Sequence, residues 1–308
     1  TARDGLGPLF FFFLCEHCHP NNSRGLATNK DGDVTRSLVM RLSVPESKNI
    51  NNNLIKTNGF IPEPTYGAQL SFNATSDVDY EGYLDVDYKY VTSKYDDGDR
   101  YELRYPTYKI SKLQYGDLDK DANAAAHIAL ALTGLGAIES IPKEDILANE
   151  DIEDKNSDGI SGKANWVYNP ETNTTQLGRF THKAAAATVK HQSANAAHND
   201  MGLSNPLYPN HNCTDKQVEC QKALKGQHEF DLPMHRLDAI TYYLKTLKIP
   251  AQRKSENFEK GEQIFNDLGC VKCHVESFKT SDGVTIKPYS DFLLHDMGDD
   301  LADGHSVF

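Results

Sequence analysis

Two copies of one short pattern decide how this chain is read: Cys15-Glu-His-Cys18-His19 near its start and Cys270-Val-Lys-Cys273-His274 near its end. Cys-x-x-Cys-His is the attachment pattern of c-type haem, in which both thiols bond to the macrocycle and the histidine ligates iron. Two intervening residues allow one helical turn to present both sulfurs to the same edge of the macrocycle. The two copies therefore predict two covalently bound haem c groups, attached at Cys15, Cys18, Cys270 and Cys273 and ligated by His19 and His274.

An alternative use of the same cysteines is a single four-cysteine zinc site, in which the two histidines have no part. Only 12 of the 308 residues are histidine. A histidine directly after both Cys-x-x-Cys pairs would be a rare coincidence, so haem iron is the favoured interpretation.

Length and charge limit the classes of protein to consider. A chain of 308 residues allows two domains with their own cores. The net charge of −12 argues against binding to nucleic acid or to anionic membranes. It would suit a binding partner that is a small electron-donor protein with a basic or dipolar surface, such as a cytochrome or a cupredoxin. The longest apolar run, residues 9–14, is far shorter than the ~18 residues of a membrane span. Because the chain begins at Thr1 and not at Met, we expect a processed, mature protein.

Two cysteines, Cys213 and Cys220, lie outside the haem motifs. Haem c is attached outside the cytoplasm, where disulfides persist, so the simplest prediction is a structural disulfide that closes a short loop. A redox-active pair is the alternative, and it would allow a thiol oxidoreductase activity.

Hydrophobic periodicity indicates several helices and one hairpin. Residues 80–110 alternate apolar and polar side chains on either side of a turn, which predicts a two-stranded hairpin. Helical patterns cover residues 122–138, 182–199 and 237–247, and an amphipathic stretch at 258–268 runs straight into the second haem motif. These patterns predict a mainly α fold.

A charged linker near residue 252 separates two predicted domains. Residues 1–251 would form an N-terminal haem domain that carries the hairpin and a calcium-type loop at 151–165. Residues 252–308 would form a C-terminal cytochrome-c-like haem domain, and their number is small enough that we expect it to be incomplete.

The second haem needs a sixth iron ligand, and Met297 follows His274 within the same predicted domain. A methionine thioether is the usual partner of a histidine in electron-transfer cytochromes, where it raises the reduction potential. We therefore predict His274 and Met297 as the axial pair, with His295 as the second candidate.

A calcium site is predicted between the two motifs. Asp154-Lys-Asn156-Ser-Asp158-Gly-Ile160 matches the first half of a calcium loop, in which alternate oxygens converge on a hard cation. The predicted ligands are the side chains of Asp154, Asn156 and Asp158 and the backbone carbonyl of Ile160. The twelfth position is Asn165 instead of glutamate, which weakens the match, and an acidic turn without metal is the alternative.

Three further residues are candidates for redox chemistry. Trp166, the only tryptophan, follows the calcium-type loop and could carry electrons between the haems, although core packing is the commoner role. Gln192 lies among alanines that would let a flat haem approach, but a hydrogen-bonded core glutamine is the favoured explanation. Glu139 ends a predicted helix and is either a helix-end group or a general acid–base over the first haem.

Several segments, in this order, resemble one known family. They span residues 5–10, 66–70, 134–142, 158–162, 177–180, 199–203 and 289–298. Together with the two haem motifs they resemble the bacterial di-haem oxidoreductases, often labelled thiol oxidoreductases and related to di-haem cytochrome c peroxidases. The resemblance extends over nearly the whole chain.

The resemblance implies a periplasmic, mostly helical protein with two cytochrome-c-like domains and calcium between them. In the peroxidase relatives, the N-terminal haem meets peroxide and the C-terminal haem accepts electrons. By position, His19 and His274 would be the proximal ligands and Met297 the distal ligand of the second haem. Glu139 would be the candidate carboxylate for peroxide chemistry.

Three activities follow from these observations. A peroxidase-type enzyme would keep the sixth position of the first haem open or displaceable, with Glu139 or Gln192 assisting cleavage of the O–O bond. A pure electron-transfer cytochrome would close that position with a histidine, for which the candidates are His127, His182, His191 and His198. A thiol oxidoreductase would use the Cys213 and Cys220 pair.

Overall fold

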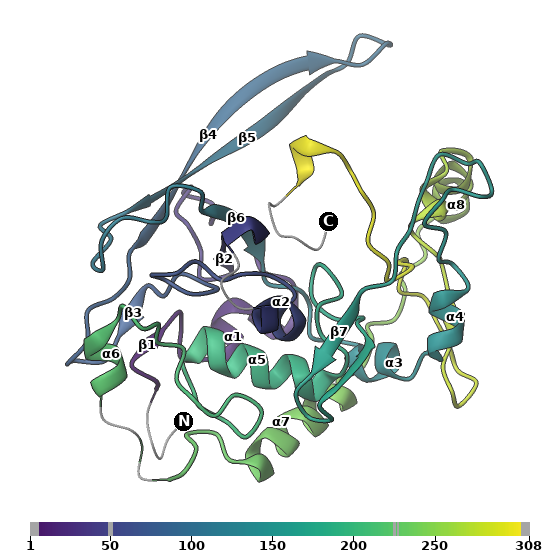
Figure 1. Cartoon of the computed structure of the whole chain (residues 1–308). Helices are drawn as coiled ribbons and strands as arrows, with labels where there is room; N and C mark the ends of the chain where they lie inside the picture. The colour runs from purple at the N-terminus through teal and green to yellow at the C-terminus, as the bar shows by residue number, and fades with distance from the viewer. Residues whose placement is uncertain (1–5, 49–51, 224–225, 227, 303–308) are drawn as a thin grey trace.

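The computed structural model describes residues 6–48, 52–223, 226 and 228–302 (Figure 1). Helices account for 25% of the structure and strands for 23%, and the strands form several small antiparallel sheets. The predicted mainly α fold is therefore wrong. The molecule combines short helices, two-stranded sheets and long connecting segments.

The largest departure from the predicted helices is the pair of strands β2 (Leu38–Ser43) and β6 (Asn123–Ile128). In β2 the alternate residues Leu38, Met40 and Leu42 are buried in the main core. Buried backbone N–H and C=O groups need partners, and β6 supplies them along the whole of β2. Pairing with β2 therefore outweighs the helix propensity of the alanines in residues 122–138.

The predicted hairpin is confirmed. Strand β4 (Tyr83–Lys94) pairs with β5 (Arg100–Ser111), and the ribbon extends away from the body of the molecule (Figure 1). Leu84 is buried at the base of the hairpin and belongs to the main core. Gly98 forms the turn with a φ of +96°, a conformation that favours glycine.

Helix α5 (Val189–Met201) begins later than the predicted start at residue 182. The hydroxyl of Thr188 accepts a hydrogen bond from the backbone N–H of His191 (3.0 Å), which is the contact that marks a helix N-terminus. Just upstream, Ala184 has a φ of +49°, which a right-handed helix does not contain. The sequence signal for this start was a threonine at the N-cap position.

Two more helices pack against α5. They are α3 (Leu135–Glu139) and α7 (Met234–Thr246), and α7 confirms the helix predicted around residues 237–247. Gly136 makes the close approach of α3 and α7 possible, because a Cβ there would lie 2.3 Å from the carbonyl oxygen of Lys245. Helix α8 (Phe258–Asp267) confirms the predicted amphipathic stretch before the second haem motif.

The remaining elements are short. The helices are α1 (Cys15–Cys18), α2 (Asn52–Asn58), α4 (Lys143–Leu147) and α6 (Val218–Lys222). Three strand pairs complete the set: β1 (Leu9–Phe10) with β3 (Asn73–Ala74), β7 (Trp166–Asn169) with β8 (Thr174–Leu177), and β9 (Phe278–Lys279) with β10 (Thr285–Ile286).

A second hydrophobic core joins the two predicted domains. Ile141, Ile146 and Leu177 pack with Phe278 and Ile286, which lie on the other side of the predicted boundary. The boundary near residue 252 stays a prediction. The shared core nevertheless fixes the segment that follows the second haem motif against residues 141–177.

Candidate haem sites

The first haem motif forms α1, and its histidine is oriented by the backbone. Nδ1 of His19 lies 2.5 Å from the carbonyl oxygen of Leu130, which leaves Nε2 as the nitrogen available to a metal. Cys15 and Cys18 are both free thiols. Burial, and secondarily the carboxylate of Asp200, raise the pKa of Cys18 to about 12, so this sulfur stays protonated at neutral pH.

The second motif repeats the same arrangement. Nδ1 of His274 lies 2.9 Å from the carbonyl oxygen of Tyr289, and Nε2 is again available. Beside this motif, α8 contributes to a cavity of about 260 Å³ whose lining includes Phe258, Phe265 and Val271. The Phe265 ring centre is 6.2 Å from that of His274. An apolar wall next to the cysteines and the histidine suits a flat, hydrophobic macrocycle.

Both motifs therefore fit covalently attached haem. Each offers two thiols that form no disulfide and one imidazole whose Nδ1 contacts a backbone carbonyl. Such a contact is the usual support of a metal-binding histidine. Across the described residues, no group of three or more His, Cys, Asp or Glu side chains is arranged to bind a metal ion directly. This finding gives no support to the four-cysteine zinc alternative.

The comparison with protein families decides the identity. The sequence model of the family described as "Di-haem oxidoreductase, putative peroxidase" matches residues 1–308, the whole chain. The chain belongs to this family. Searches against curated proteins and against solved structures find no match.

In this di-haem oxidoreductase, the two candidates for the sixth ligand of the second haem differ in availability. Both ring nitrogens of His295 are engaged: Nδ1 is 2.9 Å from the carbonyl oxygen of Ser161, and Nε2 is 2.7 Å from Oδ2 of Asp291. Met297 is 65% exposed. Met297 stays the predicted ligand, and His295 would have to give up one of its two contacts to bind iron.

The calcium-type loop folds as a series of side-chain-supported turns. Oδ1 of Asp154 and Oδ1 of Asn156 each accept a hydrogen bond from the backbone N–H of Asp158 (both 2.9 Å), and Oδ1 of Asp158 accepts one from the N–H of Ile160 (3.0 Å). Each of these oxygens supports the loop backbone through a hydrogen bond. Calcium binding by this loop stays a prediction.

The same loop touches the second haem motif. Nζ of Lys272 donates a hydrogen bond to the carbonyl oxygen of Asp158 (2.7 Å). The backbone of Lys163 forms an antiparallel β-bridge with that of Leu294. Trp166 follows at the start of β7 and is 51% exposed, so it is not a core residue. The structure thus places Trp166 on the surface, close in sequence to the residues that contact the second motif.

Glu139 lies where α3, α5 and α7 meet. Its Oε1 accepts a hydrogen bond from the backbone N–H of Val189 (2.9 Å), and its Oε2 forms an ion pair with Lys245. Both carboxylate oxygens therefore hold the first turn of α5 against its neighbours. Gln192 lies in that same first turn and is partly buried.

Three of the four histidines that could ligate the first haem make hydrogen bonds or ring contacts within the protein. Nε2 of His182 is 2.8 Å from the carbonyl oxygen of Ile128. His191 accepts from the N–H of Ala187 (3.3 Å) through Nδ1, and its Nε2 is 3.1 Å from the hydroxyl of Tyr208. His198 stacks on Tyr208, and its buried Nδ1 has no hydrogen-bond partner in the described structure.

The fourth candidate, His127, lies on β6 with its ring centre 4.8 Å from that of His182. Burial lowers the pKa of both His191 and His198 to about 4, so both imidazoles are neutral at neutral pH.

One network beside the first motif was not predicted. Asp200 accepts a hydrogen bond from Nε2 of Gln69 (2.8 Å), and Gln69 accepts one from Arg41 (3.0 Å). The carbonyl oxygen of Asp200 also accepts from the N–H groups of Phe11 and Phe12, which lead into the motif. Burial raises the pKa of Asp200. Gln69 and Asp200 lie in two of the segments that resemble the family, which was the available signal.

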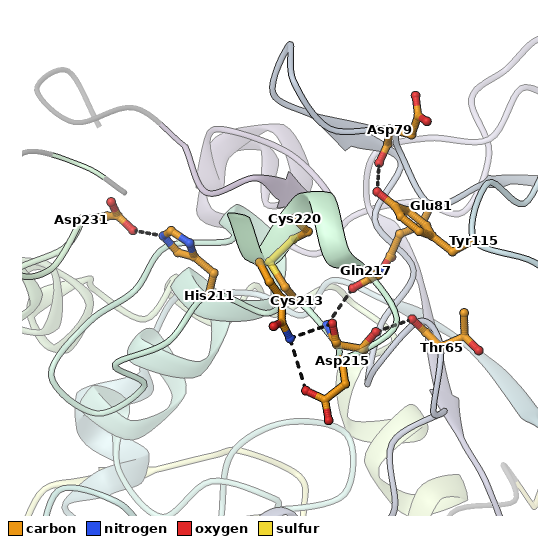
Figure 2. Close-up of a disulfide and its surroundings, with 12 residues drawn as sticks. Thr65, Asp79, Glu81, Tyr115, His211, Cys213, Asp215, Gln217, Cys220 and Asp231 are labelled. Carbon is orange, nitrogen blue, oxygen red and sulfur yellow. Dashed lines mark hydrogen bonds and ion pairs between the residues drawn. A yellow bond between two sulfur atoms is a disulfide. The ribbon is translucent and has the colours of Figure 1, made fainter. Parts of the chain in front are cut away.

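The predicted bond between Cys213 and Cys220 is present, with Cα atoms 5.7 Å apart (Figure 2). The loop that it closes docks on the core, because Nε2 of Gln217 donates a hydrogen bond to Oε1 of Glu81 (2.5 Å). Cys220 is 1% exposed. A buried sulfur suits a structural role and is poorly placed to react with a thiol substrate.

Among the helices of the described ranges, none is both long and apolar enough to cross a membrane.

Proposed function

We propose that this di-haem oxidoreductase is an exported, periplasmic enzyme of the peroxidase type. In this proposal the C-terminal haem accepts electrons from a small donor protein, a cytochrome or a cupredoxin, and the N-terminal haem reduces peroxide. Two electrons and two protons convert hydrogen peroxide into two molecules of water. When bound, the haems supply the electron storage and the peroxide-binding iron for this chemistry.

The observation that carries the proposal is the unequal supply of sixth ligands. The segment after the second motif offers the exposed thioether of Met297. Among the histidines considered for the first haem, His191 has both ring nitrogens in hydrogen bonds and His182 has its Nε2 in one. A saturated iron suits electron transfer, whereas an iron with a free position suits reaction with peroxide.

The residues of the chain would contribute orientation and proton handling. The carbonyl oxygens of Leu130 and Tyr289 hold Nδ1 of His19 and His274, which would leave Nε2 of each histidine free to hold the iron. We assign to Gln192 a hydrogen bond from its side-chain amide to bound peroxide, and to Glu139 either proton transfer or the positioning of the turn that carries Gln192. The ion pair with Lys245 supports the positioning role of Glu139.

Electrons would travel between the haems directly or by way of Trp166. The exposed position of this side chain after the loop that touches Lys272 supports such a path. The charge of −12 would favour a donor protein with a basic or dipolar surface.

A stepwise reductive titration of the purified protein, followed by visible absorption and EPR, tests the proposal. We expect two haems, one low-spin with methionine ligation that is lost in Met297→Ala, and one high-spin or converted to high-spin in the half-reduced protein. Peroxide should oxidise the half-reduced protein.

Two low-spin haems at every stage, with no turnover of peroxide, would instead favour the electron-transfer cytochrome. In that case His198→Ala shows whether His198, the one of the four candidates whose buried Nδ1 lacks a partner in the described structure, closes the first site.

A further inference from the structure

The hairpin of β4 and β5 is a sheet with two free edges. Among the described residues no third strand pairs with either strand, so each outer edge presents unpaired backbone N–H and C=O groups. The ribbon extends away from the body of the molecule (Figure 1), and its aromatic side chains are open to solvent, with Tyr90 57% and Tyr105 53% exposed. A long exposed edge of this kind is a template for another strand.

The outer edge of β5 is blocked by proline. Near the turn, the N–H of Tyr95 donates to the carbonyl oxygen of Asp99 (2.8 Å), which makes these two residues a hydrogen-bonded pair. Such pairs alternate with non-hydrogen-bonded pairs, and Tyr88 opposite Pro106 falls in the second class. The nitrogen of Pro106 therefore faces outward, where a partner strand would need a donor. Strand β4 contains no proline, so its edge is the open one.

The side chains of β4 match a second copy of the same strand. If two β4 strands pair antiparallel about a two-fold axis at Tyr88, then Asp87 of each copy lies opposite Lys89 of the other. Val86 then lies opposite Tyr90. The backbone groups of Val86, Tyr88 and Tyr90 point to the open edge, so their pairs would form about six hydrogen bonds. The two pairs of Asp87 with Lys89 are of the close, non-hydrogen-bonded class, in which side chains approach most nearly.

Neighbouring two-fold registers are less favourable. An axis at Asp87 places this aspartate opposite its own copy, and an axis at Lys89 does the same for the lysine. An axis at Val86 places Asp85 opposite Asp87. Like charges directly opposite one another destabilise a strand pair. An axis at Tyr90 brings no opposite charges together. Among these five registers, only the one at Tyr88 pairs opposite charges without opposing like ones.

We infer that a second copy of this chain binds along β4, giving a symmetric dimer with a continuous sheet in the order β5–β4–β4–β5. The tip of each hairpin would lie against the base of the other. Tyr88, Tyr90, Tyr108 and Pro106 share one face, and Arg104 lies 4.1 Å over the ring of Tyr88, so an aromatic surface would continue across the two-fold axis.

Charge reversal on β4 tests this interface without touching the haem sites. Sedimentation equilibrium of the haem-loaded protein at about 0.15 M salt should show a monomer–dimer equilibrium. Asp87→Lys and Lys89→Asp each replace two attractive pairs by two repulsive ones, so each should raise the dimer dissociation constant about 10- to 100-fold. The double variant Asp87→Lys/Lys89→Asp restores opposite charges and should dimerise like the wild type.

A control separates this pairing from general charge effects. Glu102→Lys on β5 changes the net charge as Asp87→Lys does, but it lies away from the β4 edge and should leave the dissociation constant unchanged. Far-UV circular dichroism checks that all variants are folded. A wild type that is monomeric up to about 1 mM overturns the inference. So do single variants that dimerise normally, or a double variant that fails to recover.

Discussion

One buried carboxyl group, that of Glu81, should make a contribution to stability that falls as pH rises through the neutral range. Glu81 is 2% exposed, and burial raises its pKa from the usual 4.5 to about 8. Hydrogen bonds from the N–H of Ser71 and from Gln217 act in the opposite direction but do not cancel the effect of burial. At pH 7 the folded protein therefore holds a proton on Glu81 that the unfolded chain has lost.

The size of the effect follows from proton linkage. The folded state binds one more proton than the unfolded state between about pH 4.5 and pH 8, so the free energy of unfolding decreases by up to about 1.4 kcal/mol per pH unit within that window. The contribution of Glu81 is fully present below pH 4.5, has fallen by about 3 kcal/mol at pH 7, and is constant above pH 8. Glu81→Gln removes this dependence, because an amide does not titrate.

Urea unfolding of the wild type and of Glu81→Gln at several pH values from 5 to 8 measures the prediction. Any pH-independent cost of placing an amide beside Ser71 does not affect the slope of the free energy of unfolding against pH. The variant should gain stability relative to the wild type by about 3 kcal/mol across this range. Glu153→Gln is the control, at a side chain that is 76% exposed. Its free energy of unfolding should change with pH as that of the wild type does. A flat difference between Glu81→Gln and the wild type would refute the assignment.

Four other changes have defined outcomes. Met297→Ala should lower the reduction potential of one haem by on the order of 100 mV, measured by redox titration, because a thioether ligand favours the reduced iron. Glu139→Ala should cost about 1–2 kcal/mol of stability, since it removes both the contact to Val189 and the ion pair with Lys245, and Glu139→Gln should recover part of it. Gly136→Ala should destabilise by about 1–3 kcal/mol in thermal unfolding, because its methyl group would meet the Lys245 carbonyl. If calcium binds the loop, adding it to chelator-treated protein should raise Tm, and Asp154→Ala should abolish that increase.

The two Cys-x-x-Cys-His motifs can be identified from the sequence, because the attachment and ligation that they predict would depend on five consecutive residues. Helix α8 before the second motif is amphipathic in the sequence itself. Helix α7 was predictable for the same reason. Sequence periodicity also identified the hairpin, since β4 and β5 alternate regularly on either side of a turn.

The parts that were not predictable depend on distant partners. Residues 123–128 form a strand only because β2 is buried alongside, although the alternation of Leu38, Met40 and Leu42 was a readable sign of β2. The carbonyl oxygens that orient the two histidines belong to Leu130 and Tyr289, and a backbone group leaves no mark in a sequence. The calcium-type motif could be read from the sequence, whereas the hydrogen bonds from its oxygens to the loop backbone could not.

The two histidine supports differ in how far the chain must travel to build them. Tyr289 is 15 positions from His274, whereas Leu130 is 111 positions from His19. Closing a long segment costs more entropy and is slower than closing a short one. If haem is attached at both motifs, maturation should therefore be ordered. The backbone support of His274 can form as soon as its own short segment collapses, whereas the support of His19 forms only after strand β6 and the turn after it have been assembled.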